Sequence, residues 1–188
     1  MSRTTMFGPR RGGGIRLTVP KAEAPILDGL LEQLCELVAP EQPADPDPLA
    51  AMLEIGTATR APDDPVLARL FPDAYPDDPE AAGEFRRYTE IGLRDQKYQR
   101  AVLARATLPG ATRGRDLSDA ETMAWLGALN DLRLALGTRL GVSEDDPEQF
   151  ANLTEDDPSW TSHLVYNWLG GLQELLVHCL SGALDGAD

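Results

Sequence analysis

The sequence predicts a mainly all-α protein, a single-domain helical bundle of about five helices that follows a short N-terminal β-hairpin. Apolar residues recur at spacings of three and four through most of the chain, which is the period of an α-helix. Asp-Pro and Ser-x-x-Glu sequences precede these runs, where helices are expected to begin. A length of 188 residues with 42% hydrophobic residues suits one domain, residues 1–188, with a core of its own.

The first 19 residues are predicted to form a basic β-hairpin. Two short β-prone runs, TTMF and IRLTV, flank the glycine-rich stretch GPRRGGG. Five basic residues and no acidic one occur in residues 1–21. Of these, Arg10, Arg11 and Arg16 are the candidates for a nucleic-acid contact. A solvated arm without a ligand is the alternative interpretation.

The helical body is predicted to extend from residue 24 to residue 184. Its predicted helices begin beside prolines or capping residues and end at Pro or Gly. In chain order, the first predicted helix starts at about Ala24 and ends before Pro40, and the second is a short helix through Leu49, Met52 and Leu53. The other three predicted helices extend from Pro79 to about Leu108, from Ser118 to Gly141, and from Pro158 to about Leu184.

The tripeptide Asp-Asp-Pro occurs four times, at 63–65, 77–79, 145–147 and 156–158. Paired carboxylates bind hard cations, but these copies lack the alternating oxygen ligands and central Gly of a calcium loop. Each copy precedes an apolar periodic segment, where Asp can cap the first N–H groups and Pro needs no donor. We therefore interpret the copies as helix starts.

The long helix at 79–108 is predicted to have an apolar side and a cationic side. At the helical period, Tyr88, Ile91, Tyr98 and Val102 gather on one side of this helix. The predicted partner-binding residues form a cationic ridge on the other side: Arg86, Arg87, Arg94, Lys97 and Arg105, with Arg100. We expect this ridge to dock an acidic surface of another protein. The alternative is pairing with acidic residues of neighbouring loops.

The charge and hydropathy of the chain exclude some classes of function. A net charge of −14 repels phosphate backbones, so nucleic-acid contact is expected only indirectly or through the N-terminal arm. No apolar run approaches the roughly 20 residues of a membrane span, and the N-terminus has no apolar leader, which predicts a cytoplasmic protein. Cys35 and Cys179 lie among leucines, as buried free thiols do.

No sequence pattern points to catalysis, a metal or a cofactor. Glu174 and His178 are four residues apart on one helix, but two ligands are too few for a zinc site, and Cys179 points to another side. The GGG at 12–14 lacks the strand-loop-helix setting of a phosphate site. We therefore expect a protein that is not an enzyme and needs no cofactor or metal.

The stretch ALNDLRLALGTRLGV at 128–142 places an Arg beside an apolar stripe. Leu129, Leu132 and Leu136 lie in that stripe, and Arg133 lies just beyond it. An Arg there can bury its stem and offer its donors to carboxylates or helix-end carbonyls. We predict structural roles for Arg133, Asn130 and Asp131, with a counter-charge for Arg133 from another segment.

Three segments together resemble the AosR-like family of small actinomycete proteins, catalogued as a domain of unknown function. They are ARLFPDAYPDDPEAAGEFRR at 68–87, WLGALNDLRLALGTRLGV at 125–142 and YNWLGGLQELL at 166–176. The resemblance implies a non-enzymatic regulatory protein of the oxidative-stress response. It implies action through protein-protein contacts with a sigma factor or the transcription machinery.

The resemblance leaves one alternative function open, and this chain differs from the family in the spacing of its cysteines. The alternative is a structural or adaptor protein that serves Clp proteolysis or cysteine-synthesis machinery, without nucleic-acid contact. The redox role in the family is linked to a closely spaced cysteine pair, whereas Cys35 and Cys179 lie far apart in sequence and in different predicted helices. The resemblance does not specify an oligomeric state.

Overall fold

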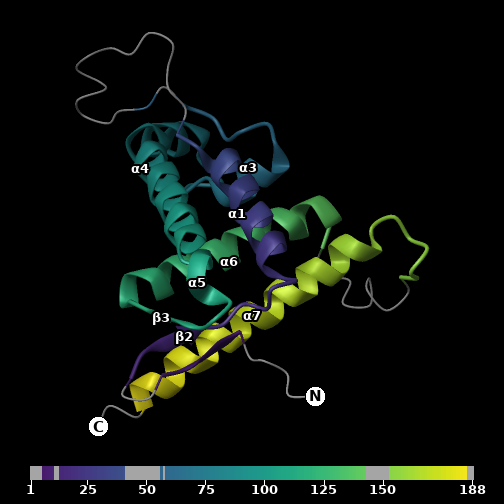
Figure 1. The fold of residues 1–188 in the computed structure, drawn as a ribbon. Helices are drawn as coiled ribbons and strands as arrows, with labels where there is room; N and C mark the ends of the chain where they lie inside the picture. The colour runs from purple at the N-terminus through teal and green to yellow at the C-terminus, as the bar shows by residue number, and fades with distance from the viewer. Residues whose placement is uncertain (1–5, 11–12, 41–55, 57, 143–152, 186–188) are drawn as a thin grey trace.

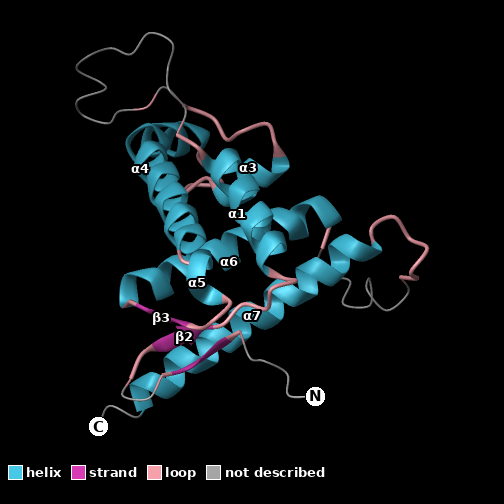
Figure 2. Ribbon diagram, in the orientation of Figure 1, coloured by secondary structure: helices cyan, strands magenta, loops and turns pink. Residues whose placement is uncertain are grey.

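The computed structural model describes residues 6–10, 13–40, 56, 58–142 and 153–185. Its elements, in chain order, are β1 (Phe7–Pro9), β2 (Ile15–Leu17), α1 (Ala24–Val38), α3 (Pro65–Leu70), α4 (Pro79–Ala106), α5 (Leu108–Ala111), β3 (Arg115–Leu117), α6 (Asp119–Leu140) and α7 (Trp160–Asp185). Helices dominate this part of the chain and a small sheet accompanies them, which confirms the predicted fold class (Figures 1 and 2). The predicted helix at 49–53 and the Asp-Asp-Pro at 145–147 lie outside the described residues.

Two Asp-Asp-Pro copies act as the predicted helix starts. The Asp64 carboxylate accepts a hydrogen bond from the Val66 N–H at 2.7 Å at the start of α3. Asp78 accepts one from the Ala81 N–H at 3.1 Å at the start of α4. The copy at 156–158 caps a turn instead, because the Asp157 carboxylate accepts a hydrogen bond from the Ser159 N–H and α7 begins two residues after Pro158, at Trp160.

The helix α6 has the predicted signals at both ends. Ser118 and Glu121 form a capping box in which each side chain bonds the backbone N–H of the other residue. At the other end Gly141 has φ +66°, a left-handed conformation that favours glycine. These local signals explain why the bounds of α6 were predictable from sequence.

The sheet has a third strand that the sequence did not predict. The strand order is β1-β2-β3, antiparallel throughout, with Phe7 opposite Leu17 and Ile15 opposite Leu117. The sequence of β3 is Arg-Asp-Leu, which lacks a β-prone run such as the TTMF and IRLTV that predicted the hairpin. The strand β1 packs against α7 (Figure 2).

Helix α6 is the central element of the core, since α1, α3, α4 and α7 all pack against it. Its Trp125 is 0% exposed, and its ring meets the edge of Phe7 with 5.6 Å between ring centroids. The Trp125 Nε1–H donates to the Thr107 hydroxyl at 2.8 Å, and that hydroxyl donates to the Ala104 carbonyl. Trp125 therefore joins the sheet, the end of α4 and α6. Among the described helices, none is long and apolar enough to cross a membrane.

Replacing Trp125 by Phe is expected to lower the free energy of unfolding by about 1–3 kcal/mol, because the Thr107 hydroxyl loses a buried donor and the core loses volume. Urea denaturation followed by far-UV circular dichroism measures this change. The Thr107→Val variant is the partner in a double-mutant cycle, since it removes the same hydrogen bond. Fully additive losses in the double variant would contradict the assigned bond.

Candidate functional site

Helix α4 buries a row of charged side chains at four-residue spacing. Arg86 is 5% exposed and Arg94 is 6% exposed, with the buried Glu90 between them. The Glu90 carboxylate pairs with Arg86 through one oxygen and accepts from the Arg94 Nε–H at 2.9 Å through the other. A buried carboxylate is costly unless it is paired, and here two guanidinium groups meet it.

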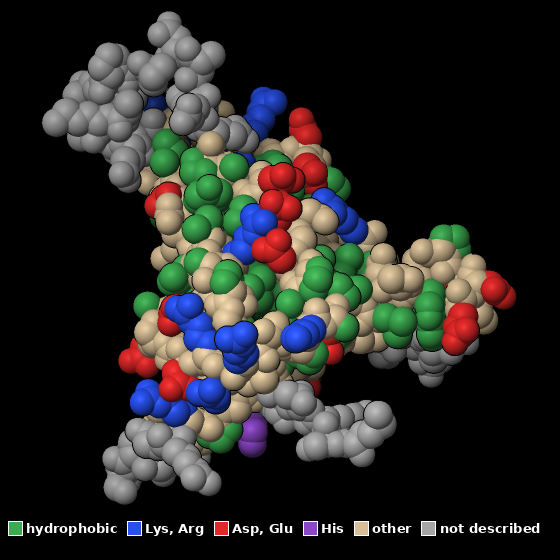
Figure 3. All heavy atoms as spheres, in the orientation of Figure 1, with side chains coloured by type: hydrophobic (Ala, Val, Ile, Leu, Met, Phe, Trp, Pro, Cys, Tyr) green, Lys and Arg blue, Asp and Glu red, His purple; other side chains and the backbone are tan. Residues whose placement is uncertain are grey.

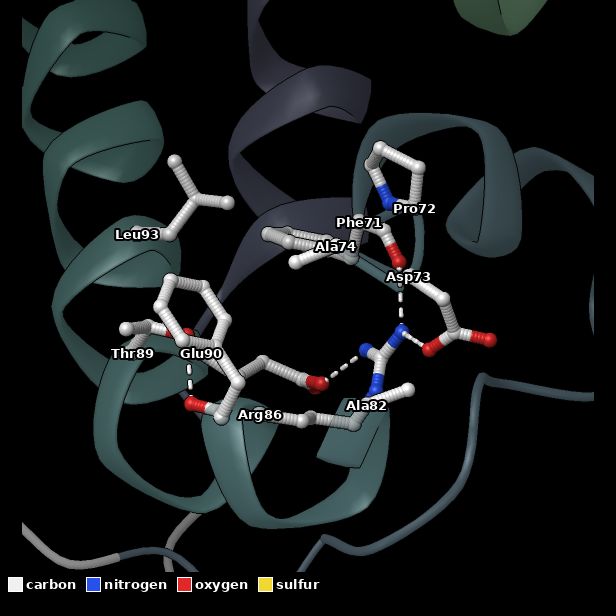
Figure 4. Close-up of a pocket in the computed structure, with 10 residues that line it drawn as sticks. Phe71, Pro72, Asp73, Ala74, Ala82, Arg86, Thr89, Glu90 and Leu93 are labelled. Atoms are coloured by element: carbon white, nitrogen blue, oxygen red, sulfur yellow. Dashed lines mark hydrogen bonds and ion pairs between the residues drawn. The ribbon is translucent and has the colours of Figure 1, made fainter. Parts of the chain in front are cut away.

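The segment after α3 completes this charge cluster (Figure 4). The Arg86 Nη2 donates to the Phe71 carbonyl at 2.9 Å and to the Asp73 carboxylate at 2.7 Å. Burial opposes the charged form of Arg86, but hydrogen bonds to Asp73 and Glu90 outweigh it and raise the pKa of the guanidinium. Arg86 therefore remains a cation that ties α4 to residues 71–73.

The aromatic ring of Phe71 lies against two cations of α4. The Arg94 guanidinium is 4.5 Å from the ring centroid, and the Lys97 ammonium is 6.0 Å from it. The Lys97 ammonium also donates to the Asp131 carboxylate of α6 at 2.6 Å, and Asp131 is 2% exposed. Asp131 thus lies in the interface of α4 and α6, whereas Asn130 is exposed.

The prediction of an exposed cationic ridge is wrong for Arg86 and Arg94, which are buried, and Lys97 is largely covered. The Arg105 guanidinium, at the end of α4, pairs with Asp28 and Glu32 of α1. Its hydrogen bond lowers the pKa of Asp28. Of the five predicted partner-binding residues only Arg87 is exposed, and its Nε lies 3.5 Å from the Gly56 carbonyl oxygen. Arg86, Arg94, Lys97 and Arg105 therefore pair within the chain, as in the alternative interpretation, but their acidic partners lie mainly on α1, α4 and α6 rather than in the expected loops.

Because these cations face inward or towards α1, α4 presents apolar residues to solvent. Tyr88, on the side of α4 predicted to be apolar, is 64% exposed. We define the outer face of α4 by its exposed large hydrophobic residues, which are Phe85, Tyr88, Ile91, Leu93, Val102 and Leu103. Figure 3 shows hydrophobic side chains over the part of the surface where α4 lies in Figure 1.

A pocket of about 210 Å³ opens between the first half of α4 and the segment after α3. Its lining residues are Phe71, Pro72, Asp73, Ala74, Ala82, Phe85, Arg86, Thr89, Glu90 and Leu93. Figure 4 shows the charge pair of Arg86 and Glu90 on one side of the pocket, with Leu93 farther along α4. The Thr89 hydroxyl donates to the Phe85 carbonyl at 2.8 Å, so its hydrogen is used within the helix.

The segment between α3 and α4, which forms one wall of the pocket, is acidic. It carries three exposed aspartates: Asp73, which lines the pocket, and Asp77 and Asp78, which follow it before α4 begins. We call these three residues the acidic rim. A pocket with mostly apolar walls and an acidic rim is suited to an apolar group carried by a basic molecule.

The predicted basic arm is part of the sheet and is partly neutralised there. Asp116 of β3 pairs with Arg10 at 3.2 Å and with Arg16 at 2.6 Å, while Arg11 lies outside the described residues. Strand β3 and the turn before it add Arg115, which pairs with Glu121, and the exposed Arg113. Figure 3 shows basic side chains with acidic ones between them over this end of the molecule.

Arg133 lies between α6 and α7, bordering the core as its position predicts. Its Nη1 donates to the Gln173 amide oxygen at 2.7 Å, and its guanidinium is 5.6 Å from the centroid of the Tyr166 ring. Among the described residues, the contacts of the Arg133 guanidinium are thus a neutral amide oxygen and an aromatic face rather than the expected counter-charge. Sequence spacing cannot identify such a partner because Gln173 lies on a different helix.

Both cysteines are free thiols, Cys35 partly buried and Cys179 buried. Burial raises the pKa of each thiol, and the Cys179 thiol donates to the Phe7 carbonyl at 3.7 Å. A raised pKa lowers the thiolate fraction that reacts with oxidants. Within the described residues, no three His, Cys, Asp or Glu side chains are grouped to hold a metal ion.

Comparison with known proteins identifies relatives over most of the chain. The family model described as domain of unknown function (DUF2017) matches residues 2–180. An AosR protein of Mycobacterium leprae is 33% identical over 192 residues, which cover 94% of this chain and 85% of that protein. Proteins named oxidative stress regulator AosR in Mycobacterium tuberculosis and Mycobacterium bovis are each 32% identical over 194 residues, covering 95% of this chain and 86% of theirs. No solved structure matches the chain.

Replacing Glu90 by Gln is expected to lower the free energy of unfolding by about 3 kcal/mol, because two buried guanidinium groups lose their shared carboxylate. The matched control is Glu84→Gln on the same helix, where the exposed position predicts a change within about 0.5 kcal/mol. Chemical denaturation of both variants at one pH measures the difference. Equal stability of the two variants would refute the buried charge cluster.

Proposed function

Since the chain belongs to the DUF2017 family and is a relative of the mycobacterial oxidative stress regulators, we propose that it regulates the response to oxidative stress by binding another protein. The proposal includes no catalytic step and no cofactor. The partner we propose is a component of the transcription machinery, with a sigma factor as the first candidate.

The exposed outer face of α4 is the observation that supports a protein contact. Large hydrophobic side chains on this face meet solvent, although the chain has 26% charged residues with which to cover its surface. Contiguous exposed apolar patches typically mark protein-protein contacts, and the central parts of such contacts are depleted of charged residues. Tyr88 is a natural anchor, because tyrosine is enriched among residues that dominate binding energies.

The charge of the molecule favours this contact over direct nucleic-acid binding. The net charge of −14 opposes a phosphate backbone, and Asp116 already pairs with two arginines of the sheet. An acidic protein is instead attracted to basic surfaces of other proteins. These charges therefore favour a basic partner, whereas an exposed cationic ridge predicted an acidic one.

Co-purification from cells exposed to peroxide tests the proposed function. We expect the tagged protein to retain RNA polymerase or a sigma factor, and Tyr88→Ala to lower that recovery at least about tenfold through loss of an exposed anchor. Arg113→Ala, in the turn before β3, is the control and is expected to retain the partner. The proposal fails if neither component is recovered, or if Tyr88→Ala and wild type recover it equally. Recovery of Clp or cysteine-synthesis components instead would favour an adaptor role.

A further inference from the structure

We propose that the pocket beside α4 binds a basic amphipathic helix of another protein, which inserts one apolar side chain between α4 and residues 71–74. This inference rests on the proposed function, since both place the partner on the outer face of α4. It adds the chemistry of the occupant: its charge, its secondary structure and the side chain that anchors it.

The volume of the pocket suits a single side chain better than a whole ligand or cofactor. Drug-sized ligands and cofactors occupy sites of roughly 300–1,000 Å³, larger than the 210 Å³ of this pocket. A dry apolar cavity of about 150 Å³ is large enough for benzene. The pocket therefore has room for one leucine or phenylalanine side chain, with Phe85 and Leu93 as its apolar walls.

The polar atoms in the pocket are largely engaged with one another. Both Nη atoms of Arg86 bond acceptors of the chain, and both oxygens of Glu90 accept hydrogen bonds. The Arg86 Nε is the exception, since it is buried without a hydrogen-bond partner among the described residues, whereas these other groups are satisfied before any partner arrives. An inserted group that makes no hydrogen bonds of its own leaves these bonds intact, which favours an apolar side chain.

The acidic rim specifies the charge of the occupant. Arg86 is the basic residue among those that line the pocket, and Asp73 and Glu90 offset its charge. Arg87 is turned towards Gly56 rather than into the pocket lining. The exposed carboxylates of the rim, on a protein of net charge −14, attract lysine and arginine side chains that flank the apolar anchor.

The shape of the α4 surface favours a helix as the partner segment that binds there. A row without charged residues continues from the pocket along α4 at alternating spacings of four and three: Phe85, Thr89, Gly92, Gln96, Gln99 and Leu103. Residues at this period share one side of a helix, so a second helix can pack along them, with the apolar Phe85 and Leu103 at the two ends of the row. The row extends about 27 Å, the length of five turns. A Cβ atom placed on Gly92 has nothing within 4 Å, so the middle of the row is open to a close approach.

Fluorescence anisotropy with two labelled peptides and the purified full chain tests this inference. Both peptides are 18-residue amphipathic helices with leucines at heptad spacing, one flanked by lysines and the other by glutamates. We expect the lysine peptide to bind at least about tenfold more tightly, with an affinity that falls as salt rises. Equal binding of the two peptides, tighter binding of the glutamate peptide, or binding of neither would overturn the inference.

Two alanine-to-tryptophan variants locate the binding site. Ala74→Trp fills the pocket from an exposed position and is expected to weaken the lysine peptide at least about tenfold. Ala120→Trp adds the same side chain at an exposed position of α6 outside the pocket and is expected to bind as wild type does. Unchanged binding by Ala74→Trp would place the peptide elsewhere and refute the inference. Sedimentation at the same protein concentration tests whether a second copy of this chain occupies the pocket instead. A dimer that the Ala74→Trp variant dissociates would also refute the inference.

The outcomes distinguish this inference from the proposed function. If the peptides do not bind but co-purification still depends on Tyr88, only the nature of the occupant is wrong. If the lysine peptide binds the pocket but no transcription component is recovered from cells, the occupant is right and the proposed function is wrong.

Discussion

The pairing of Glu90 with Arg86 and Arg94 fixes how α4 is turned about its own axis. A carboxylate in this buried position requires cationic partners, and residues four positions away on the same helix supply both. With this side inward, Phe71 lies under the Arg94 guanidinium and Lys97 reaches Asp131 of α6. The apolar residues on the opposite side of α4 are then left at the surface.

The sequence predicted most helix starts and ends because their signals are local. Asp64, Asp78, Ser118 and Gly141 each act within four residues of their own position. The orientation of α4 was not predictable in the same way, since periodicity separates two faces without saying which one meets the core. The spacing of Arg86, Glu90 and Arg94 was the signal that could have shown it. Strand β3 and the pocket depend on contacts between distant segments, which no local pattern records.

The inward arginines change the kind of partner that the molecule is suited to bind. An exposed cationic ridge favours an acidic partner, whereas an apolar face beside an acidic rim favours a basic one. The family match and the names of the mycobacterial relatives supply the setting of oxidative stress, and the surface of α4 supplies a place for a protein contact. Burial raises the pKa of both free thiols, the partly buried Cys35 and the buried Cys179, which lowers the thiolate fraction that oxidants attack. In this account the chain acts through its partner.

Labelling of arginine side chains with phenylglyoxal, read out by mass spectrometry of peptides, tests the orientation of α4 most directly. Arg86 and Arg87 are adjacent in sequence, so they share a peptide and differ in burial. The account predicts rapid modification of Arg87 and protection of Arg86 and Arg94 in the folded protein, with all three modified in denaturant. Equal reactivity of Arg86 and Arg87 in the folded protein would contradict the buried charge cluster and the outward apolar face that follows from it.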